Sequence, residues 1–394
     1  AGYFKGNDFI RECKRQGCRI ILLTRERLRD EEWPRDCLDH IITVPDRAET
    51  ETYIHAVSEI ARSQKPDLVV ALEESDVITA ARIREHLCLP GLTATEARGF
   101  RDKLWMRFKA AGAGIAQPEF VSLLNYQEVG EYLERVPPPW VVKPRADASS
   151  IGIKRLDDAE GVWRLKDRLD ARESLRERSS DYLLERFITG DVFHVDSLVC
   201  DGEVVFAGAD CYGSPPLKVV QEGGVSTSFT LRYDSDERRE LLEINRELLA
   251  GFGLARGAAH AEFIRNALDG HFYFLEVAAR VGGAYTAETL EAASGVNLWR
   301  EWARIETADA EHPYQLPQAR REYAGIAVSL ARQESPDTAA YNDPEIACRA
   351  SKPWHAGLVV RSPEYERVIE LLEQYRQRFE RDFTATAPQQ ERPE

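Results

Sequence analysis

The chain has no long hydrophobic run and no excess of positive charge. Its apolar stretches all fall well short of the roughly 20 residues that a membrane-spanning helix needs. Lysine and arginine number 52 against 67 aspartates and glutamates, a formal net charge of −15. Because nucleic-acid backbones are bound by basic surfaces, this balance argues against such a partner. We therefore expect neither a membrane nor a nucleic acid among its partners.

Sulfur-containing residues are also scarce. The 7 cysteines are scattered and show no metal-ligand spacing, so we expect reduced thiols and a cytoplasmic location. Cys211 has no neighbouring base in the sequence that would activate it as a nucleophile. No signal peptide is visible, and the chain begins at Ala1 without methionine, which leaves a longer native N-terminus open.

A length of 394 residues exceeds one compact core and predicts two or three domains. In residues 1–92, helical patterns alternate with continuous apolar runs, at 18–24, 40–44 and 67–72. This alternation predicts a small parallel α/β domain. Ligand sites of such domains lie at the carboxyl ends of strands, and the polar residues there are Glu73, Glu74 and Asp76.

From residue 93 the pattern changes to short alternating strands. The segment 93–310 predicts a mixed α+β body built from antiparallel hairpins. Residues 311–384 carry further apolar strands and an amphipathic helix, and we expect them to form a C-terminal closing segment. The polar residues 385–394 are expected to form a disordered tail.

Two glutamates near the middle of the chain give the most specific prediction. Glu262 and Glu276 lie in strand-like runs on either side of Leu268-Asp-Gly270, a loop typical of a β-hairpin. Counting back from this loop places Ala267 opposite His271 and Glu262 opposite Glu276, so both carboxylates project from one face. Close carboxylates repel unless a cation lies between them, and oxygen ligands suit Mg²⁺ or Mn²⁺. This arrangement predicts a nucleotide enzyme; the alternative is an exposed hairpin whose glutamates face water.

A second candidate site follows the strand that ends at Lys143. The turn behind it contains Ser149, Ser150 and Gly152, whose backbone N–H groups can form a nest for phosphate oxygens. A lysine beside such a nest would neutralise part of a triphosphate. The turn lacks the GxxxxGK[ST] pattern and no helix follows it, so a P-loop fold is not expected.

Taken in order, these motifs resemble those of the ATP-grasp ligases over nearly the whole chain. The series is Asp102-Lys103, Val141-Val-Lys143-Pro144, Leu183-Leu-Glu185-Arg-Phe-Ile188-x-Gly190, Glu262, Glu276 and Arg280-x-Gly282-Gly283. The resemblance implies an ATP-grasp fold with an N-terminal parallel α/β (pre-ATP-grasp) domain. It also implies a lid subdomain at about 110–187 that folds over ATP, and a body that carries the metal ligands.

The resemblance implies a role for each matching position. The lysines that hold the α- and β-phosphates would be Lys103 and Lys143. The loop over the γ-phosphate would contain Ser149 and Ser150. The hinge that reads the adenine edge would comprise Glu185, Arg186, Phe187 and Ile188. The ligands of Mg²⁺ (or Mn²⁺) would be Glu262 and Glu276, and the cofactors would be ATP and this metal ion.

Three features depart from the family pattern. The γ-phosphate loop is usually richer in glycine, but here it contains Ala146 and Ala148. Val192 stands where a glutamate often binds the ribose, while His194-Val-Asp196 is similar to the His-Val-Glu of the biotin carboxylase branch, so we expect His194 to bind the ribose hydroxyls. Ala278 replaces the asparagine that is usually a third metal ligand, which leaves open whether one or two metal ions are held.

ATP-grasp enzymes generally phosphorylate a carboxylate and let a nucleophile displace the phosphate, which requires positioning and charge neutralisation. Arg280 is the expected catalytic residue, placed to stabilise the acyl phosphate; a salt bridge to Glu262 or Glu276 is the alternative. Further candidates would bind substrate, with a plain turn or a surface loop as their alternatives: Glu74, Tyr212 in the long polar loop 212–226, Gly282 and Gly283.

We therefore expect an ATP-dependent carbon–nitrogen ligase whose small-molecule substrates are a carboxylate and an amine, as in amino-acid ligases. Two alternatives stay open: a biotin-carboxylase-like or purine-pathway ligase, and a nucleotide-binding module without turnover. Met106 is the only methionine, so no Met-Lys-Met biotin acceptor occurs. Related ligases are often dimers, and the resemblance therefore also implies a homodimer.

Overall fold

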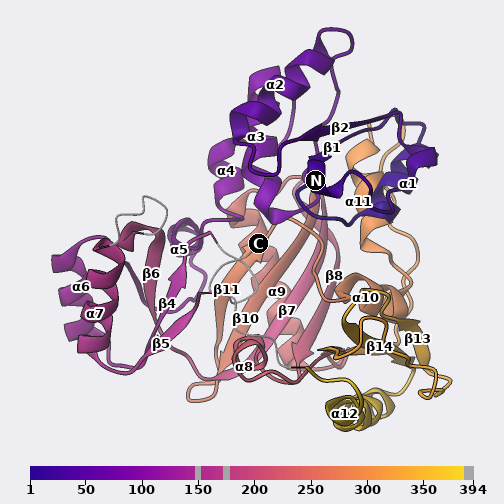
Figure 1. Ribbon diagram of the computed structural model, residues 1–394. Helices are drawn as coiled ribbons and strands as arrows, with labels where there is room; N and C mark the ends of the chain where they lie inside the picture. The colour runs from indigo at the N-terminus through magenta and orange to yellow at the C-terminus, as the bar shows by residue number, and fades with distance from the viewer. Residues whose placement is uncertain (147–151, 172–177, 386–394) are drawn as a thin grey trace.

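The computed structural model describes residues 1–146, 152–171 and 178–385 (Figure 1). The predicted phosphate-loop residues Ser149 and Ser150 lie outside these ranges, as does nearly all of the predicted tail. Within them, the strands form three sheets, of two, four and eight strands. No helix in the described ranges is both long and apolar enough to cross a bilayer.

The N-terminal region is a parallel pair of strands with helices around it (Figure 1). Its elements are α1 (Asn7–Arg15), β1 (Ile21–Arg25), β2 (His40–Val44), α2 (Thr50–Ala61), α3 (Val77–Leu87) and α4 (Ala94–Arg98), with 3₁₀ turns at 26–28, 35–37 and 74–76. β1 and β2 pair in parallel where the first two apolar runs predicted strands. The parallel α/β class predicted for this region is confirmed.

The third strand predicted for this region, residues 67–72, is wrong. These described residues join neither β1 nor β2. Arg84 of α3 donates from Nη1 to the Val69 carbonyl at 2.7 Å. Leu72 is buried in a core cluster that includes Phe9 of α1. Leu68 is 42% exposed, so only the end of the run is buried. Because a side chain satisfies a backbone carbonyl and Leu72 packs on a helix, the run needs no partner strand.

An eight-stranded sheet fills the centre of the molecule, and every pair of neighbouring strands in it is antiparallel. Its order is β11-β10-β7-β8-β9-β12-β14-β13. The strands are β7 (Gly190–Cys200), β8 (Glu203–Tyr212), β9 (Val225–Thr230), β10 (Gly257–Asn266), β11 (Phe272–Ala278), β12 (Tyr323–Leu330), β13 (Ile346–Arg349) and β14 (His355–Ser362). The predicted hairpins β7–β8 and β10–β11 are present, whereas β9 and β13 were not predicted.

Alternate residues of the central strands face two different helix layers. On β7, Phe193 and Val195 pack in the core with α5 (Lys103–Gly112) and α9 (Asp236–Phe252). Leu198 lies on the other face and packs with α1, α10 (Thr286–Ser294) and α11 (Leu298–Thr307). His194 and Asp196 share the parity of Leu198, so these two polar residues lie on this second face.

A separate four-stranded sheet, in the order β3-β6-β4-β5, lies at the left of Figure 1. Its elements are β3 (Phe120–Ser122), α6 (Tyr126–Arg135), β4 (Trp140–Pro144), β5 (Lys154–Leu156), α7 (Ala159–Asp170), a 3₁₀ turn at 179–181 and β6 (Tyr182–Arg186). Trp140 and Leu184 belong to a core of its own, apart from that of the large sheet. The sheet falls within the residues predicted to form a lid; the domain boundaries themselves stay predictions.

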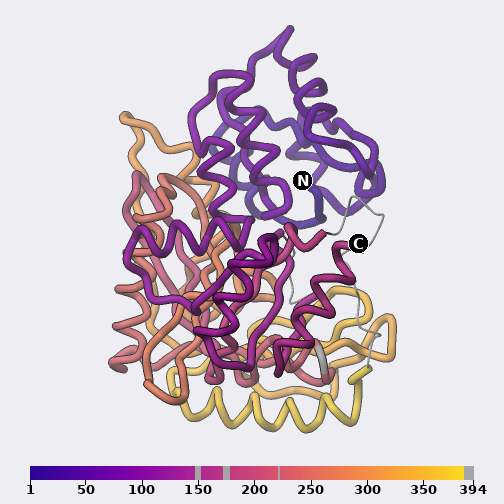
Figure 2. The backbone as a smooth tube through the Cα atoms, turned by 90° about the vertical axis from the view of Figure 1, so that its left-hand side faces the viewer, coloured from indigo at the N-terminus to yellow at the C-terminus, as the bar shows by residue number. Residues whose placement is uncertain are grey.

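The C-terminal strands β12, β14 and β13 continue the large sheet. The helix α12 (Tyr365–Asp382) packs on them through Val368, Leu372 and Tyr375. Figure 2 shows α12 along the end of the molecule opposite the N-terminal region. The predicted long loop after β8 contains a short helix, α8 (Pro216–Glu222).

The hairpin β10–β11 has the predicted pairing of Glu262 with Glu276, and it reaches this register in an unexpected way. The loop is longer than predicted, because the Asn266 N–H bonds the His271 carbonyl at 2.9 Å and the ladder starts at Arg265–Phe272. A register shift between Glu262 and Phe263 then offsets the difference. Gly270 has φ +75°, the left-handed conformation predicted for the loop glycine.

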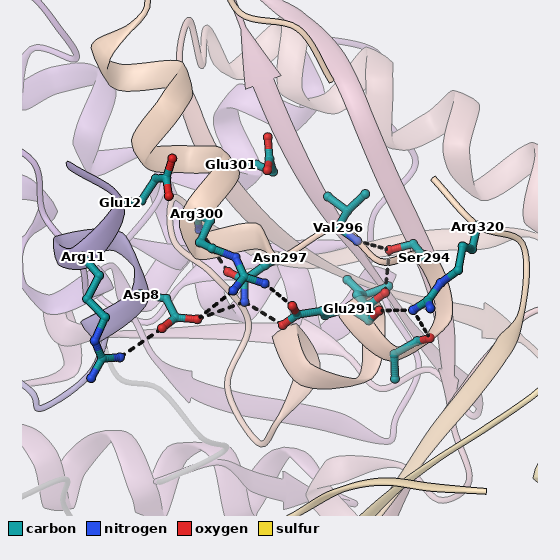
Figure 3. A network of polar contacts seen from close by, with 12 residues as sticks. Asp8, Arg11, Glu12, Glu291, Ser294, Val296, Asn297, Arg300, Glu301 and Arg320 are labelled. Carbon is teal, nitrogen blue, oxygen red and sulfur yellow. Dashed lines mark hydrogen bonds and ion pairs between the residues drawn. The ribbon is translucent and has the colours of Figure 1, made fainter. Parts of the chain in front are cut away.

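Polar contacts join α1 to α10 and α11 (Figure 3). Asp8 accepts a hydrogen bond from Asn297 Nδ2 at 3.1 Å, and the same amide donates to Glu291 at 2.6 Å. Arg300 also pairs with Glu291. These bonds attach the N-terminal region to the helices that cover the polar face of the large sheet.

We expect Glu12→Ala to loosen this attachment. Glu12 is 1% exposed and accepts hydrogen bonds from Arg304 Nε at 2.7 Å and Arg15 Nη1 at 2.9 Å. Loss of charged hydrogen bonds of this kind costs about 1–3 kcal/mol. Urea denaturation should show this decrease in the free energy of unfolding, and hydrogen exchange should accelerate in α1 and α11. The exposed Glu32→Ala is the control, and equal effects of both variants would contradict the attachment.

Candidate active site

The predicted acid pair lies near one edge of the large sheet. Glu262 and Glu276 are direct register partners, so their side chains project from the same face. Tyr212 donates from its hydroxyl to Glu262 Oε1 at 2.9 Å, and Lys103 Nζ lies 2.8 Å from Glu276 Oε2. Burial raises the pKa of Glu276, but Lys103 and then Lys143 outweigh burial and hold this pKa at about 2. Glu276 is therefore ionised at neutral pH.

Glu185 of β6 lies between two cations. Its Oε1 is 2.6 Å from Arg107 Nε, and its Oε2 is 2.7 Å from Lys143 Nζ. The side chains of Arg107 and Glu185 are both 0% exposed. Burial raises the pKa of Glu185, but Arg107 and Lys143 together lower it to about 2. The Glu185 side chain thus holds Lys143 in place, while a role of its backbone toward adenine stays a prediction.

Arg107 is a site residue that the sequence analysis did not single out. Its Nη2 donates to the carbonyl of Leu275 at 2.5 Å, next to Glu276 and at the register shift of the hairpin. One signal was available, because Arg107 follows Lys103 by four residues on a helix and shares its face. A fully buried arginine needs a carboxylate partner, but its partner lies 78 residues further on, which the sequence does not reveal.

Arg186, Phe187 and Ile188 link β6 of the small sheet to β7 of the large one. The Phe187 N–H donates to the Pro139 carbonyl at 3.0 Å, and the Arg155 guanidinium lies 5.0 Å from the centre of the Phe187 ring. Ile188 is 8% exposed and packs in a small apolar cluster. The segment therefore connects the two sheets as a hinge would, and its contact with adenine stays a prediction.

His194 belongs to a buried polar network. Its Nδ1 lies 2.7 Å from Asp196 Oδ2, and its Nε2 lies 2.7 Å from Ser228 Oγ. The other Asp196 oxygen lies 2.9 Å from His260 Nδ1. Burial would lower the pKa of His260, but Asp196 and then Glu262 raise it to about 10, so the ring is cationic at neutral pH. Both nitrogens of His194 contact protein groups, so ribose binding by His194 would need these contacts to open.

Arg280 contacts the N-terminal region instead of the acid pair. Its Nε and Nη2 lie 3.0 and 2.8 Å from Glu74 Oε2, and its Nε lies 3.3 Å from Glu73 Oε1. Arg101 Nη1 pairs with the other oxygen of Glu74 at 2.7 Å. The salt bridge to Glu262 or Glu276 that sequence analysis gave as the alternative is therefore replaced by one to Glu73 and Glu74. Two predicted site residues, Arg280 and Glu74, are brought together across 206 positions of sequence.

Gly282 and Gly283 differ in their surroundings. A Cβ at Gly282 would lie 2.5 Å from Asp196 Oδ1 and 2.9 Å from His260 Nδ1, so only glycine fits there. A Cβ at Gly283 would meet nothing within 4 Å. The Gly283 carbonyl accepts a hydrogen bond from the hydroxyl of Thr286 at 2.6 Å. The first glycine thus permits close packing on the histidine network, and binding of substrate by either one stays a prediction.

The donor set at the acid pair fits a hard divalent cation. Glu262 and Glu276 supply oxygens only, and the Glu276 carboxylate is kept ionised by its lysine neighbours. Ala278 offers no further donor, being 8% exposed and apolar. Lys103 and Lys143 lie close enough to Glu276 to lower its pKa, so cationic side chains and carboxylates converge on one place. Such a place suits a polyphosphate with its metal ion.

The chain is similar in sequence to known proteins. A family model described as the ATP-grasp domain matches residues 136–288. An L-arginine-specific L-amino acid ligase of Bacillus subtilis is 25% identical over 270 residues, which cover 68% of this chain and 64% of that protein. An alanine–anticapsin ligase of Bacillus subtilis is 23% identical over 268 residues, covering 63% and 55%. The matched regions thus span less than two thirds of either relative.

Solved structures extend the fold match to nearly the whole chain. An L-amino acid ligase from Bacillus licheniformis superposes with a TM-score of 0.73 at 18% identity, covering 96% of both chains. A biotin carboxylase domain from Hydrogenobacter thermophilus, in complex with MgADP, ADP and bicarbonate, gives a TM-score of 0.69 at 16% identity, covering 94% and 86%. The chain is therefore an ATP-grasp domain protein. More particularly, it is distantly related to the L-amino acid ligases.

Glu185→Gln should destabilise the protein by about 3–5 kcal/mol at pH 7, because it leaves two cations beside a neutral buried group. The pKa of Glu185 is lowered from 4.5 to about 2 in the folded state. The wild-type advantage should therefore be complete above about pH 4.5 and should be lost as the pH falls toward 2. Urea denaturation at several pH values measures this advantage.

The matched control is Glu119→Gln, since Glu119 is 50% exposed and lies 3.6 Å from Arg186. This exposed pair should contribute at most about 1 kcal/mol. A difference between wild type and Glu185→Gln that stays constant from pH 7 to pH 3 would contradict the assignment of the ion pair.

Proposed function

We propose that the protein is an ATP- and Mg²⁺-dependent ligase that phosphorylates a carboxylate and joins it to an amine, with an amino acid as at least one substrate. The observation that carries this proposal is the convergence of Glu262, Glu276, Lys103 and Lys143 at one edge of the sheet. The similarity to L-amino acid ligases supports the choice of reaction within the ATP-grasp proteins.

The residues of the site neutralise and position charge. Lys103 and Lys143 would each exchange a carboxylate partner for phosphate oxygens, because both now pair with glutamates. Glu262 and Glu276 would hold Mg²⁺, which offsets phosphate charge and favours attack at the terminal phosphorus. In the first step the substrate carboxylate oxygen forms a bond to that phosphorus and ADP leaves. In the second, the amine nitrogen attacks the acyl carbon, phosphate leaves, and the nitrogen loses a proton.

No protein nucleophile is needed in this scheme. Cys211 is buried, and burial raises the pKa of its thiol far above the ordinary value, so little thiolate exists at neutral pH. Arg280 would stabilise the charge of the acyl phosphate. Its salt bridge to Glu74 positions the guanidinium at the boundary between the N-terminal region and the large sheet.

The alternatives differ in substrate and not in fold. Biotin carboxylase and N5-carboxyaminoimidazole synthetase structures give TM-scores of 0.69 and 0.70, close to the 0.73 of the amino acid ligase. The relatives found by sequence favour the amino acid ligase: one is named as specific for L-arginine and another as joining alanine to anticapsin. A module that binds nucleotide without turnover remains the alternative from a different class.

The test is phosphate release from ATP·Mg²⁺ with single amino acids, pairs of amino acids, and bicarbonate. We expect release with one amino acid or one pair, and formation of a hydroxamate when hydroxylamine replaces the amine, because it traps an acyl phosphate. Glu276→Gln should abolish both signals, while Glu203→Gln, an exposed change on β8, should not. Release with bicarbonate alone would favour the carboxylase alternative, and tight ATP binding without any release would favour the binding module.

A second prediction separates the two roles of Arg280. Arg280→Lys keeps the charge but loses the forked contacts, and kcat should fall about 10²–10³-fold with little change in the KM for ATP. Glu74→Gln removes only the partner, so its kcat should fall far less.

Arg265→Lys, an exposed change on β10, is the control for this pair. Equal losses of kcat in Arg280→Lys and Glu74→Gln, with equal losses of thermal stability, would assign Arg280 a structural role only.

A further inference from the structure

A row of polar side chains leads across the large sheet away from the acid pair. Glu276 pairs with Glu262, and Glu262 pairs with His194 on β7. His194 pairs with Asp210 on β8, and Asp210 pairs with Thr230 on β9. Directly paired residues project from the same face, so these five side chains form one line. The polar surface therefore continues beyond the acid pair into the interior of the molecule.

At the Asp210 end of this row, the sheet and α10 enclose a cavity of about 30 Å³. Its floor includes Asp210, Ser226 and Ser228 of β8 and β9. Its roof includes Thr286 and Thr289 of α10 and Ala284 of the preceding loop. Such a volume holds one or two water-sized groups. Hydroxyl groups line it together with the apolar side chains of Ile326 and Val328.

Asp210 is the unusual member of this lining. It is 1% exposed, and its Oδ1 has no hydrogen-bond partner within the described part of the chain. His194 Nε2 lies 4.0 Å from Oδ2 and is itself 2.7 Å from Ser228 Oγ. Burial raises the pKa of Asp210 to about 6, although His194 and a hydrogen bond with Thr230 lower it. A buried carboxyl oxygen without a partner, such as Oδ1, destabilises a fold unless a ligand completes it.

The roof of the cavity is built from strained backbone. Ala284 and Tyr285 have φ of +50° and +65°, a region that residues other than glycine rarely adopt. The Tyr285 hydroxyl accepts hydrogen bonds from the N–H groups of Ser351 and Lys352 at 3.1 and 3.3 Å. The loop begins at Arg280, so the same segment carries the expected catalytic arginine and the roof of this cavity. Strain of this kind persists where surrounding structure enforces it, which is common at binding sites.

We propose that this cavity receives a cationic ammonium group of a substrate and that Asp210 is its counter-ion. The proposal rests on the proposed function, because it names the substrate class of the same site. An ammonium group is about as large as a water molecule and donates hydrogen bonds, which the Asp210 carboxylate and the neighbouring hydroxyls accept. An ionised Asp210 with a bound ammonium is a completed ion pair in place of a buried carboxyl group whose Oδ1 has no partner among the described residues.

The position of Asp210 sets the length of the substrate. Asp210 and Glu262 lie two strands apart, and neighbouring strands are separated by 4.7–4.9 Å, which gives about 10 Å. The α-ammonium of an amino acid lies much closer than this to its own carboxylate. The geometry therefore favours a diamino acid, such as lysine, whose second ammonium is several bonds away from the reacting carboxylate.

The test compares lysine with norleucine, which has a similar shape but no second ammonium, in wild type and in Asp210→Asn. In the wild type, phosphate release at saturating ATP·Mg²⁺ should show a lower KM for lysine than for norleucine. Asp210→Asn should raise the lysine KM roughly 10–100-fold, the range for a charged hydrogen bond, and leave the norleucine KM unchanged. Asp191→Asn, an exposed change on β7, is the control. Equal changes for both amino acids in Asp210→Asn would overturn the pocket while leaving the ligase proposal intact.

Binding without turnover gives an independent readout. In the presence of ADP and Mg²⁺, lysine should raise the melting temperature of the wild type more than norleucine does, and this difference should vanish in Asp210→Asn. If no carboxylate supports turnover but this difference is seen, the pocket stands and the ligase proposal fails. If lysine and norleucine raise the melting temperature of the wild type equally, the cavity holds water and the pocket proposal is overturned.

A second variant guards against misfolding of Asp210→Asn. Ser226→Lys would place a tethered ammonium beside Asp210, so it should block lysine binding. Both Ser226→Lys and the uncharged Ser226→Met, of similar length, overfill the cavity, and Ser226→Lys should lose less thermal stability than Ser226→Met. A loss of stability in Ser226→Lys that equals the loss in Ser226→Met would show that Asp210 gains nothing from an ammonium, and this would also overturn the proposal.

Discussion

Glu185 accepts ion pairs from Arg107 of α5 and from Lys143 of β4 while belonging to β6 itself. Arg107 donates onward to the Leu275 carbonyl beside Glu276. One buried carboxylate thus connects the small sheet, α5 and the strand that carries the acid pair. Because an isolated buried charge is far more costly than a paired one, these elements can be displaced only together. The geometry of Lys143 and Glu276 depends on this constraint.

The large sheet arranges the rest of the site through its register. Its antiparallel pairing places Glu276, Glu262, His194 and Asp210 in one row on the face away from α9. The chain segments that cover this face are the helices α1, α10 and α11, together with the loop that begins at Arg280. A row built in this way has the acid pair at one end and Asp210 at the interior end. Under the proposed function, these ends would separate phosphate chemistry from recognition of a second group.

Local pattern was sufficient for much of the fold. The hairpin β10–β11, the parallel pair β1–β2 and the helix α12 all follow from apolar periodicity and turn residues close in sequence. The strand predicted at 67–72 is wrong, because a strand and an extended segment can have the same composition. In the structure Arg84 donates a hydrogen bond to the Val69 carbonyl, and Leu68 is 42% exposed. The pairing of Glu262 with Glu276 was predicted from a shorter loop. It is nevertheless present, because the register shift at Phe263 offsets the longer loop.

The sequence by itself determined the residue types of the site and their order: lysines at strand and helix ends, paired glutamates across a short loop, and a glycine-rich segment after Arg280. Only the tertiary structure decided which of these side chains contact each other. Arg280 contacts Glu74, 206 positions away in the sequence, and Arg107 contacts Glu185, 78 positions away. Asp210 Oδ1 has no hydrogen-bond partner among the described residues. The physical reason is that hydrogen bonds within a turn or hairpin act between residues near in sequence, whereas ion pairs and cavities form between surfaces that only the packed fold brings together.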